Sequence, residues 1–362
     1  MNTVRTAHLP KRESNIELYR IFLMLGIIAH HYVVNSGLLP LLQSPPLSLK
    51  STFFLIFGMW GKTGINCFVL ITGYYMCKSQ ITLKKFLKLI TEVVFYNVLI
   101  FTLFIVCGYT VFTWKDCFYA ILPIKSISDG FTSCYIVFYL LIPFLNILVK
   151  NMNQYQHQML IGLFTFIFTL LGTIPFINIK MNYIEWFCVL FFISSYIRLY
   201  GLPNNYFTKH LGGVLGGAIV LAMLTVIGMV ILEKAPYYFV SDSNHLMAVV
   251  VSVCAFVFFK TIYIPYCKII NIIAQSVFGV FLIHANSDSM RQWLWYDIFE
   301  VKEQYQSEYS ALYAIITVAF IFVFCIILDY IRIRFIERPF FSYLDTIGIF
   351  EKNPNQTKNT TT

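Results

Sequence analysis

The sequence predicts an all-α membrane protein: a polytopic bundle of about ten transmembrane helices with both termini in the cytoplasm. Hydrophobic residues make up 58% of the 362 positions and charged residues only 12%, whereas an ordinary soluble domain carries roughly 25% charged residues. The mean hydropathy is +0.72. The apolar residues form repeated stretches of about 17 to 25 residues, the length that crosses a bilayer as a helix. A soluble fold is therefore excluded.

Ten such stretches divide the chain. They cover 16–36, 52–76, 86–109, 132–150, 157–177, 183–200, 211–232, 246–265, 271–287 and 309–334. No segment between them is long enough to form a second domain, so residues 1–345 are predicted to be a single transmembrane domain. Residues 346–362 end in a polar run and are expected to form a disordered cytoplasmic tail.

The distribution of lysine and arginine predicts the orientation, because cytoplasmic loops carry the excess of positive charge. With both termini inside, 18 of the 26 basic residues fall on the inner half of the protein. The net charge of +9 then follows from topology and contact with anionic lipid, and it gives no support to a nucleic-acid partner. Arg5, Lys11 and Arg12 precede the first apolar run as in a signal peptide, but no A-x-A site follows. The run is expected to remain as the first membrane helix.

Nine cysteines occur without a C-x-x-C pair and without a Cys/His cluster at metal-ligand spacing. Most of them lie inside apolar stretches, where a thiol behaves as a small hydrophobic group. We therefore expect no metal site and no redox role.

Ionisable side chains inside the first span are the strongest chemical signal. Arg20 and His31 are eleven residues apart, which at about 100° per residue places them within about 20° on the same helix face and about 16 Å apart along the axis. His30 is rotated about 80° from Arg20. Charged groups cost about 2.5–3.5 kcal/mol at the bilayer centre, so they normally face the bundle interior or a wet cavity. His31 is therefore the histidine expected to share a cavity with Arg20.

A desolvated imidazole favours its neutral form, which can accept a proton from a hydroxyl group. A purely structural interpretation also accounts for these residues. In that interpretation, the histidines hydrogen-bond between helices and Arg20 extends to the interface.

Five motifs follow one another along nearly the whole chain. The first is Arg20, ten residues and then His31. The others are Gly64 to Tyr74 with Thr72-Gly73-Tyr74, Tyr135 to Pro143, Ser276-Val-Phe-Gly279-Val-Phe-Leu-Ile-His284, and Ile336-Glu337-Arg338-Pro339. In this order they resemble the acyltransferase-3 family of integral membrane acyltransferases, whose signature is Arg-x10-His.

The chain also departs from the family pattern. Lys85-x-x-Lys88 stands where the family usually has Arg-x-x-Arg, which keeps the charge but loses bidentate phosphate geometry. Thr72 replaces a serine, and Cys134 stands where a tryptophan is common. These differences concern donor binding more than the class of reaction.

The resemblance implies an O-acetyltransferase of the polysaccharide-modifying type in the bacterial plasma (inner) membrane. It would move an acyl group, most simply acetyl, from cytoplasmic acyl-CoA to a hydroxyl of a cell-surface or exported glycan or of a lipid-linked sugar. Acyl-CoA would be a substrate, with no permanently bound cofactor, and polysaccharide assembly proteins would be partners. His31 would act as the general base, with an acyl-histidine intermediate as a variant.

The resemblance also distributes roles among the remaining candidates. Arg20 would act with His31 in catalysis, and Lys84, Lys85 and Lys88 would bind the acyl-CoA phosphates. The same lysines also fit ordinary positive-inside charge. Candidates for acceptor contacts or for the cavity are His30, Lys62, Tyr135, Ser276, His284 and Glu337.

Two other functions stay open from sequence. A lipid-linked sugar flippase or polysaccharide transporter would also have ten spans and scattered intramembrane charges, although we find no convincing internal repeat. A glycan polymerase would be expected to have larger outer loops with paired charges. Trp293, Trp295, Tyr296, Asp297 and Glu300 suit either a sugar or a membrane interface.

Overall fold

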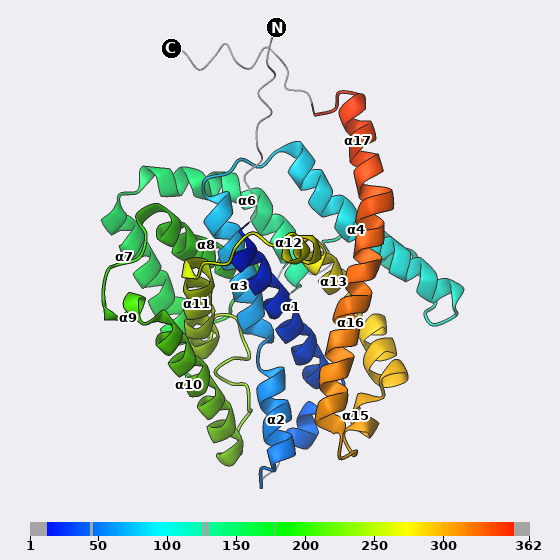
Figure 1. The fold of residues 1–362 in the computed structure, drawn as a ribbon, viewed down its shortest axis with the longest axis horizontal. Helices are drawn as coiled ribbons and strands as arrows, with labels where there is room; N and C mark the ends of the chain where they lie inside the picture. Colours follow the sequence, from blue (N-terminus) through cyan, green and yellow to red (C-terminus); the bar gives the residue numbers. More distant parts are fainter. Residues whose placement is uncertain (1–12, 44–45, 125–126, 128–129, 178, 351–362) are drawn as a thin grey trace.

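The computed structural model describes residues 13–43, 46–124, 127, 130–177 and 179–350. Within these ranges the chain is helical and contains no strand. The longer helices, shown in Figure 1, are α1 (Ser14–Val34), α2 (Leu49–Gly58), α3 (Gly61–Met76), α4 (Leu83–Val106), α6 (Phe131–Asn151), α7 (Gln154–Phe164), α8 (Tyr183–Tyr200), α10 (Leu211–Ile231), α11 (Leu246–Thr261) and α16 (Ser310–Arg332).

Shorter helices and helical turns connect or extend these elements. They are η1 (Leu39–Leu42), α5 (Trp114–Ile121), η2 (Thr165–Leu171), α9 (Tyr206–Lys209), α12 (Lys268–Gln275), α13 (Val277–His284), α14 (Asp288–Gln292), η3 (Trp293–Ile298), α15 (Val301–Gln304), η4 (Ile333–Glu337) and α17 (Arg338–Thr346). Residues 351–362 of the predicted tail, and the basic residues Arg5, Lys11 and Arg12, lie outside the described ranges.

The all-α polytopic fold is confirmed, but the predicted count of about ten spans is not. Seven helices in the described residues are long and apolar enough to cross a membrane. An eighth span results if Lys268–His284 and Asp288–Ile298, which meet at an angle of 93°, are counted together. The predicted span 246–265 corresponds to the shorter apolar helix α11. The predicted span 157–177 corresponds to α7 and η2, and the first turns of α7 are rich in glutamine.

Local sequence explains where several helices begin and end. The side chains of Ser48, Thr82 and Asn182 accept hydrogen bonds from backbone N–H groups in the first turns of α2, α4 and α8, which satisfies donors that have no partner inside the helix. Helix α8 stops at Gly201, whose φ of +77° is a conformation that favours glycine.

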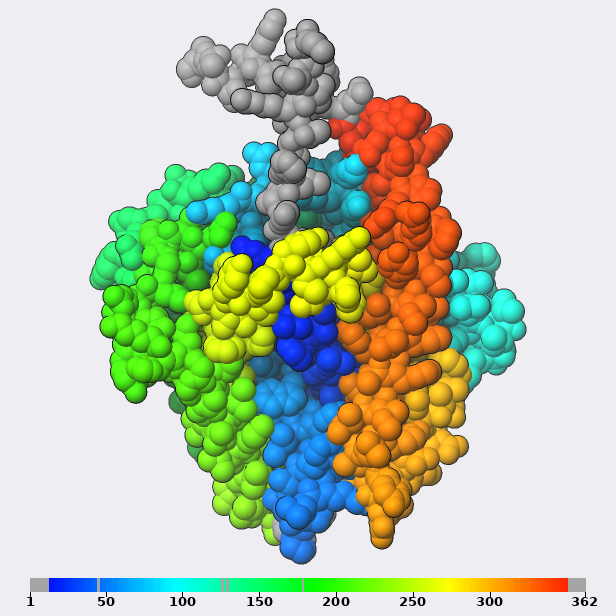
Figure 2. All heavy atoms as spheres, in the orientation of Figure 1, coloured from blue at the N-terminus to red at the C-terminus, as the bar shows by residue number. Residues whose placement is uncertain are grey.

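Helix α1 runs through the middle of the bundle (Figure 1) and packs against α2, α3, α11, α12, α13 and α16. Its first turn and α17 lie toward the same end of the molecule, which we call the inner end because the Lys/Arg bias predicts that it faces the cytoplasm. On the face shown in Figure 2, part of α1 is visible between α12 and α16. Side chains from several helices therefore meet along α1.

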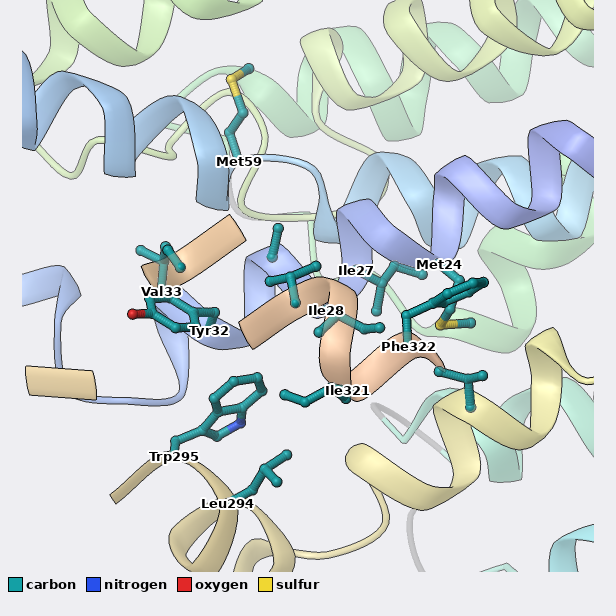
Figure 3. Packing of buried hydrophobic residues seen from close by; sticks show 14 of the residues in the cluster. Met24, Ile27, Ile28, Tyr32, Val33, Met59, Leu294, Trp295, Ile321 and Phe322 are labelled. Carbon is teal, nitrogen blue, oxygen red and sulfur yellow. The ribbon is translucent and has the colours of Figure 1, made fainter. Parts of the chain in front are cut away.

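Apolar packing fixes the outer half of α1. Ile28, Tyr32 and Val33 are buried together with Trp295 of η3 and Ile321 of α16, as Figure 3 shows. Dispersion and apolar burial in such a cluster set the position of a helix without polar contacts. The residues of α1 next to this cluster, His30 and His31, are consequently held in place by their own helix.

Arg332 joins the inner ends of α4 and α16 through charge. Its side chain is only 5% exposed and lies 2.7 Å from Asp329, 3.1 Å from Glu92 and 2.9 Å from Glu337. Lys88 of α4 completes the cluster by pairing with Glu337 at 3.0 Å. Buried charges require such mutual compensation because their desolvation is costly.

We predict that Arg332→Leu lowers the free energy of unfolding by about 3–5 kcal/mol, because it leaves buried carboxylates without their cation. Thermal unfolding of the detergent-purified protein measures the effect. Arg332→Lys keeps the charge but loses the planar fork, so its midpoint should lie between those of the native protein and Arg332→Leu. Lys302→Gln at an exposed position is the control. Equal midpoints for native and Arg332→Leu proteins would contradict the role given to this cluster.

Candidate functional site

His31 of α1 and His284 of α13 form a hydrogen-bonded pair. Nδ1 of His31 lies 3.0 Å from Nε2 of His284, and Nδ1 of His284 lies 2.6 Å from the Val280 carbonyl oxygen. His284 is 1% exposed, and the ring of Phe281 flanks both imidazoles. Two predicted site residues from distant parts of the sequence are thus brought together.

His30 faces a different neighbour. Its Nδ1 lies 2.6 Å from the carbonyl oxygen of Gly58, the last residue of α2. A Cβ atom at Gly61 would collide with the His30 ring, so only glycine at the start of α3 permits this approach. His30 is therefore used to bridge the break between α2 and α3.

Arg20 lies toward the inner end on α1 and is separated from His31 by about three helical turns, or about 16 Å. Its Nη1 is 3.3 Å from the Glu17 carboxylate, and its side chain is partly exposed. Arg20 is also an electrostatic neighbour of Tyr135 and Glu92. The structure consequently places Arg20 within the same interior region as His31 but not in contact with it.

Aromatic side chains pack along the interior between these two positions. Tyr135 of α6 shares a hydrogen bond with Thr72 of α3 at 2.9 Å, and its ring lies 6.2 Å from that of Phe278. Phe131, one turn away on α6, lies 5.1 Å from Phe281 beside the histidine pair. Helices α3, α6 and α13 thus form one wall along α1.

The three predicted acyl-CoA lysines lie at the start of α4, and each already has a partner. Lys84 pairs with Asp345 at 2.6 Å, Lys88 pairs with Glu337 at 3.0 Å, and Nζ of Lys85 donates to Ser79 Oγ at 2.8 Å. The carboxylates belong to η4 and α17, so the C-terminal segment contacts Lys84 and Lys88 but leaves all three lysines partly or largely exposed. Glu337, predicted from the Glu-x-Pro motif, is positioned by Lys88 and by Arg332 of the buried cluster.

Lys62 and Ser276 lie elsewhere around the interior. Nζ of Lys62 is 2.5 Å from the Tyr183 hydroxyl and 5.1 Å from the centre of that ring. Ser276 lies at the junction of α12 and α13, where its Oγ is buried and has no hydrogen-bond partner among the described residues.

Three charged residues near this region were missed from sequence. Asp329 and Arg332 are buried one turn apart in the last long helix, and two charges inside an apolar span are a signal that could have identified them. Arg291 is an electrostatic neighbour of both His31 and His284. It follows a helix break that sequence patterns do not reveal. Trp295, considered above for a sugar or interface contact, is fully buried.

Comparisons with known proteins agree with this arrangement of motifs. A search of curated proteins and a search of solved structures found no match. The model of the family described as "Acyltransferase domain" (Acyl_transf_3) matches residues 13–330, a range that begins just before α1 and contains Arg20, His31 and His284. The chain therefore belongs to the acyltransferase-3 family of membrane acyltransferases.

Proposed function

We propose that this membrane acyltransferase moves an acetyl group from acetyl-CoA to a hydroxyl of a cell-surface or exported glycan, with His31 as the general base. The observation that carries the proposal is the hydrogen-bonded chain from His31 through His284 to the Val280 carbonyl. Family membership favours this function over the flippase or transporter alternative.

The chain of hydrogen bonds assigns the protons when both rings are neutral. A carbonyl oxygen only accepts, so Nδ1 of His284 must donate to Val280, and Nε2 of His284 is left as an acceptor. Nδ1 of His31 must then donate to His284. In this tautomer Nε2 of His31 carries the lone pair, and no described residue hydrogen-bonds to it.

This nitrogen is suited to remove the proton of an acceptor hydroxyl. As the proton moves to Nε2, the hydroxyl oxygen forms a bond to the thioester carbonyl carbon. The carbon–sulfur bond then breaks, and the departing thiolate takes the proton back from His31 to give free CoA. General base catalysis of this kind contributes about 10²–10⁴-fold to the rate.

Donor binding is proposed at the inner end. Lys84, Lys85 and Lys88 would receive the acyl-CoA phosphates, and Arg20 would orient the chain that leads toward His31. The phosphates would replace Asp345 and Glu337 as partners of Lys84 and Lys88. Because the Lys84 pair is substantially exposed, exchanging its carboxylate for a phosphate costs little.

The cellular setting follows from the same proposal. The enzyme would act in the bacterial plasma membrane on a glycan or a lipid-linked sugar, together with polysaccharide assembly proteins. Tyr135 beside Thr72 and the flanking phenylalanines offer aromatic faces on which a sugar or the acyl chain can pack.

We predict that His31→Ala abolishes transfer of radiolabelled acetyl from acetyl-CoA to membrane glycan, because it removes the base. His30→Ala should retain transfer, since His30 bonds to Gly58 at the helix break. Membranes with equal amounts of each variant are compared by counting label in the glycan fraction. Transfer that is unaffected by His31→Ala would refute the proposed base.

His284 is predicted to set the tautomer of His31. His284→Gln retains a side-chain acceptor for Nδ1–H, so its initial rate should stay within about tenfold of native. His284→Leu removes that acceptor and should lower kcat by about 100-fold with little change in KM for acetyl-CoA. Equal losses in the two variants, with unchanged thermal stability, would argue against this positioning role.

Lys84→Gln is predicted to raise the KM for acetyl-CoA by about tenfold, the loss expected for one charge-assisted phosphate contact. Its kcat should stay near native because Lys84 lies far from His31. Lys150→Gln, which removes another exposed basic residue of the predicted inner face, serves as the matched control. If both variants have the native KM, the donor phosphates bind elsewhere.

A further inference from the structure

Lys62 is a cation inside a membrane span, and no described carboxylate pairs with it. It lies in the first turn of α3, within the span Leu49–Met76. Among the described residues its contacts are to the hydroxyl and ring of Tyr183. A charge in this position is costly without an opposite charge, and a phenol does not supply one.

Arg291 of α14, just after the helix break, is a second cation with little charge compensation, and its own side chain is 41% exposed. Its ion pair is to Asp288, one turn earlier in the same short helix, and that carboxylate is 93% exposed. Exposed pairs of this kind contribute little. The Nε atom of Arg291 is buried and has no hydrogen-bond partner in the described part of the chain. The guanidinium therefore has binding capacity that the protein leaves unused.

Both cations belong to elements next to the histidines, since Lys62 is in the first turn of α3 and Arg291 is in α14, which follows the last residue of α13, His284. Gly61, the residue before Lys62, packs directly against the ring of His30, which places Lys62 at the level of the histidines on α1. Lys62 and Arg291 are both electrostatic neighbours of His31. The buried carboxylates Glu92, Asp329 and Glu337 pair instead with Arg332 and Lys88 toward the inner end. Among the described residues, Lys62 thus has no carboxylate partner and Arg291 has only an exposed one.

We propose that Lys62 and Arg291 form a binding site for an anionic group, a carboxylate or a phosphate, that a substrate carries close to the reacting hydroxyl. The inference rests on acyl transfer at His31 and adds the chemical class of the substrate. Two sources supply the same chemistry: an acidic or phosphorylated sugar acceptor, or an acyl group that ends in a carboxylate.

The bound anion also assists the reaction. When His31 takes the hydroxyl proton, it becomes an imidazolium, which the charges of Lys62 and Arg291 repel. An anion bound by both cations offsets that repulsion. A substrate without the anion should therefore have both a higher KM and a lower kcat.

Sulfate binding to the purified full-length chain tests the site without relying on activity. The thermal unfolding midpoint is measured in sodium sulfate and in sodium chloride of equal ionic strength. Saturating sulfate should raise the native midpoint by about 2–4 °C. Lys62→Met and Arg291→Gln should lose this rise, whereas Lys62→Arg, Lys84→Gln and the exposed Lys234→Gln should keep it.

Two sulfate results would overturn the proposal. One is no rise in the native protein. The other is a rise of the unfolding midpoint that Lys62→Met and Arg291→Gln both retain. If Lys84→Gln alone abolishes this rise, sulfate binds at the lysines of α4 and not at the proposed site. Each variant must elute at the native volume in size-exclusion chromatography, which shows that folded protein is compared. Lys62→Arg keeps the positive charge but changes the side chain, so it shows whether the charge itself is required.

Activity then identifies the source of the anion. Thiol release and acyl transfer to membrane glycan are compared for acetyl-CoA and succinyl-CoA. A preference of at least tenfold for succinyl-CoA that disappears in Lys62→Met assigns the anion to the acyl group. Efficient acetyl transfer that falls at least tenfold in Lys62→Met assigns it to the acceptor. No transfer from any acyl-CoA would refute the proposed function, while the sulfate result still decides whether the anion site exists.

Discussion

The ion cluster around Arg332 is the interaction on which the arrangement of the site depends. Arg332 holds Asp329, and the Asp329 carboxylate lies directly against Gly279, where a Cβ atom would collide with it. Gly279 belongs to α13, which carries His284 at its last residue. The charge pair in α16 therefore determines how closely α13 packs and, through His284, where the His31 ring points.

The membrane makes this arrangement costly to disturb. Polar and charged atoms in a bilayer have no water to replace a lost partner, so each break in a helix must be satisfied by the protein. His30 does this for the Gly58 carbonyl at the end of α2, and His284 bonds to the Val280 carbonyl one turn earlier in its own helix, α13. His30 thus bonds only to a helix carbonyl, whereas His284 bonds both to a helix carbonyl and to the imidazole of His31.

Much of the fold and part of the site could be predicted from sequence. Apolar length predicts the all-α membrane bundle, and helical periodicity places Arg20 and His31, but not His30, on one face. The number of membrane spans was harder to predict from sequence, because composition does not reveal the 93° bend after His284 or that the polar first turns of α7 shorten its apolar stretch. Such breaks depend on tertiary partners rather than on local sequence.

The site also contains pairs that sequence spacing cannot predict. His31 and His284 are 253 residues apart, and their contact follows only from the packing of α1 against α13. The lysines of α4 were predicted as phosphate ligands from the family resemblance, yet the pairing of Lys84 with Asp345 and of Lys88 with Glu337 depends on the path of the C-terminal helices. Local chemistry identified the candidates, and long-range packing determined their partners.

A cryo-electron microscopy structure of the chain with a non-cleavable acetyl-CoA analogue, in which a methylene group separates sulfur from the carbonyl, would test the central claim most directly. Our account predicts that the carbonyl lies beside Nε2 of His31 and that the phosphates contact the first turn of α4. An analogue bound with its carbonyl away from His31 would contradict it.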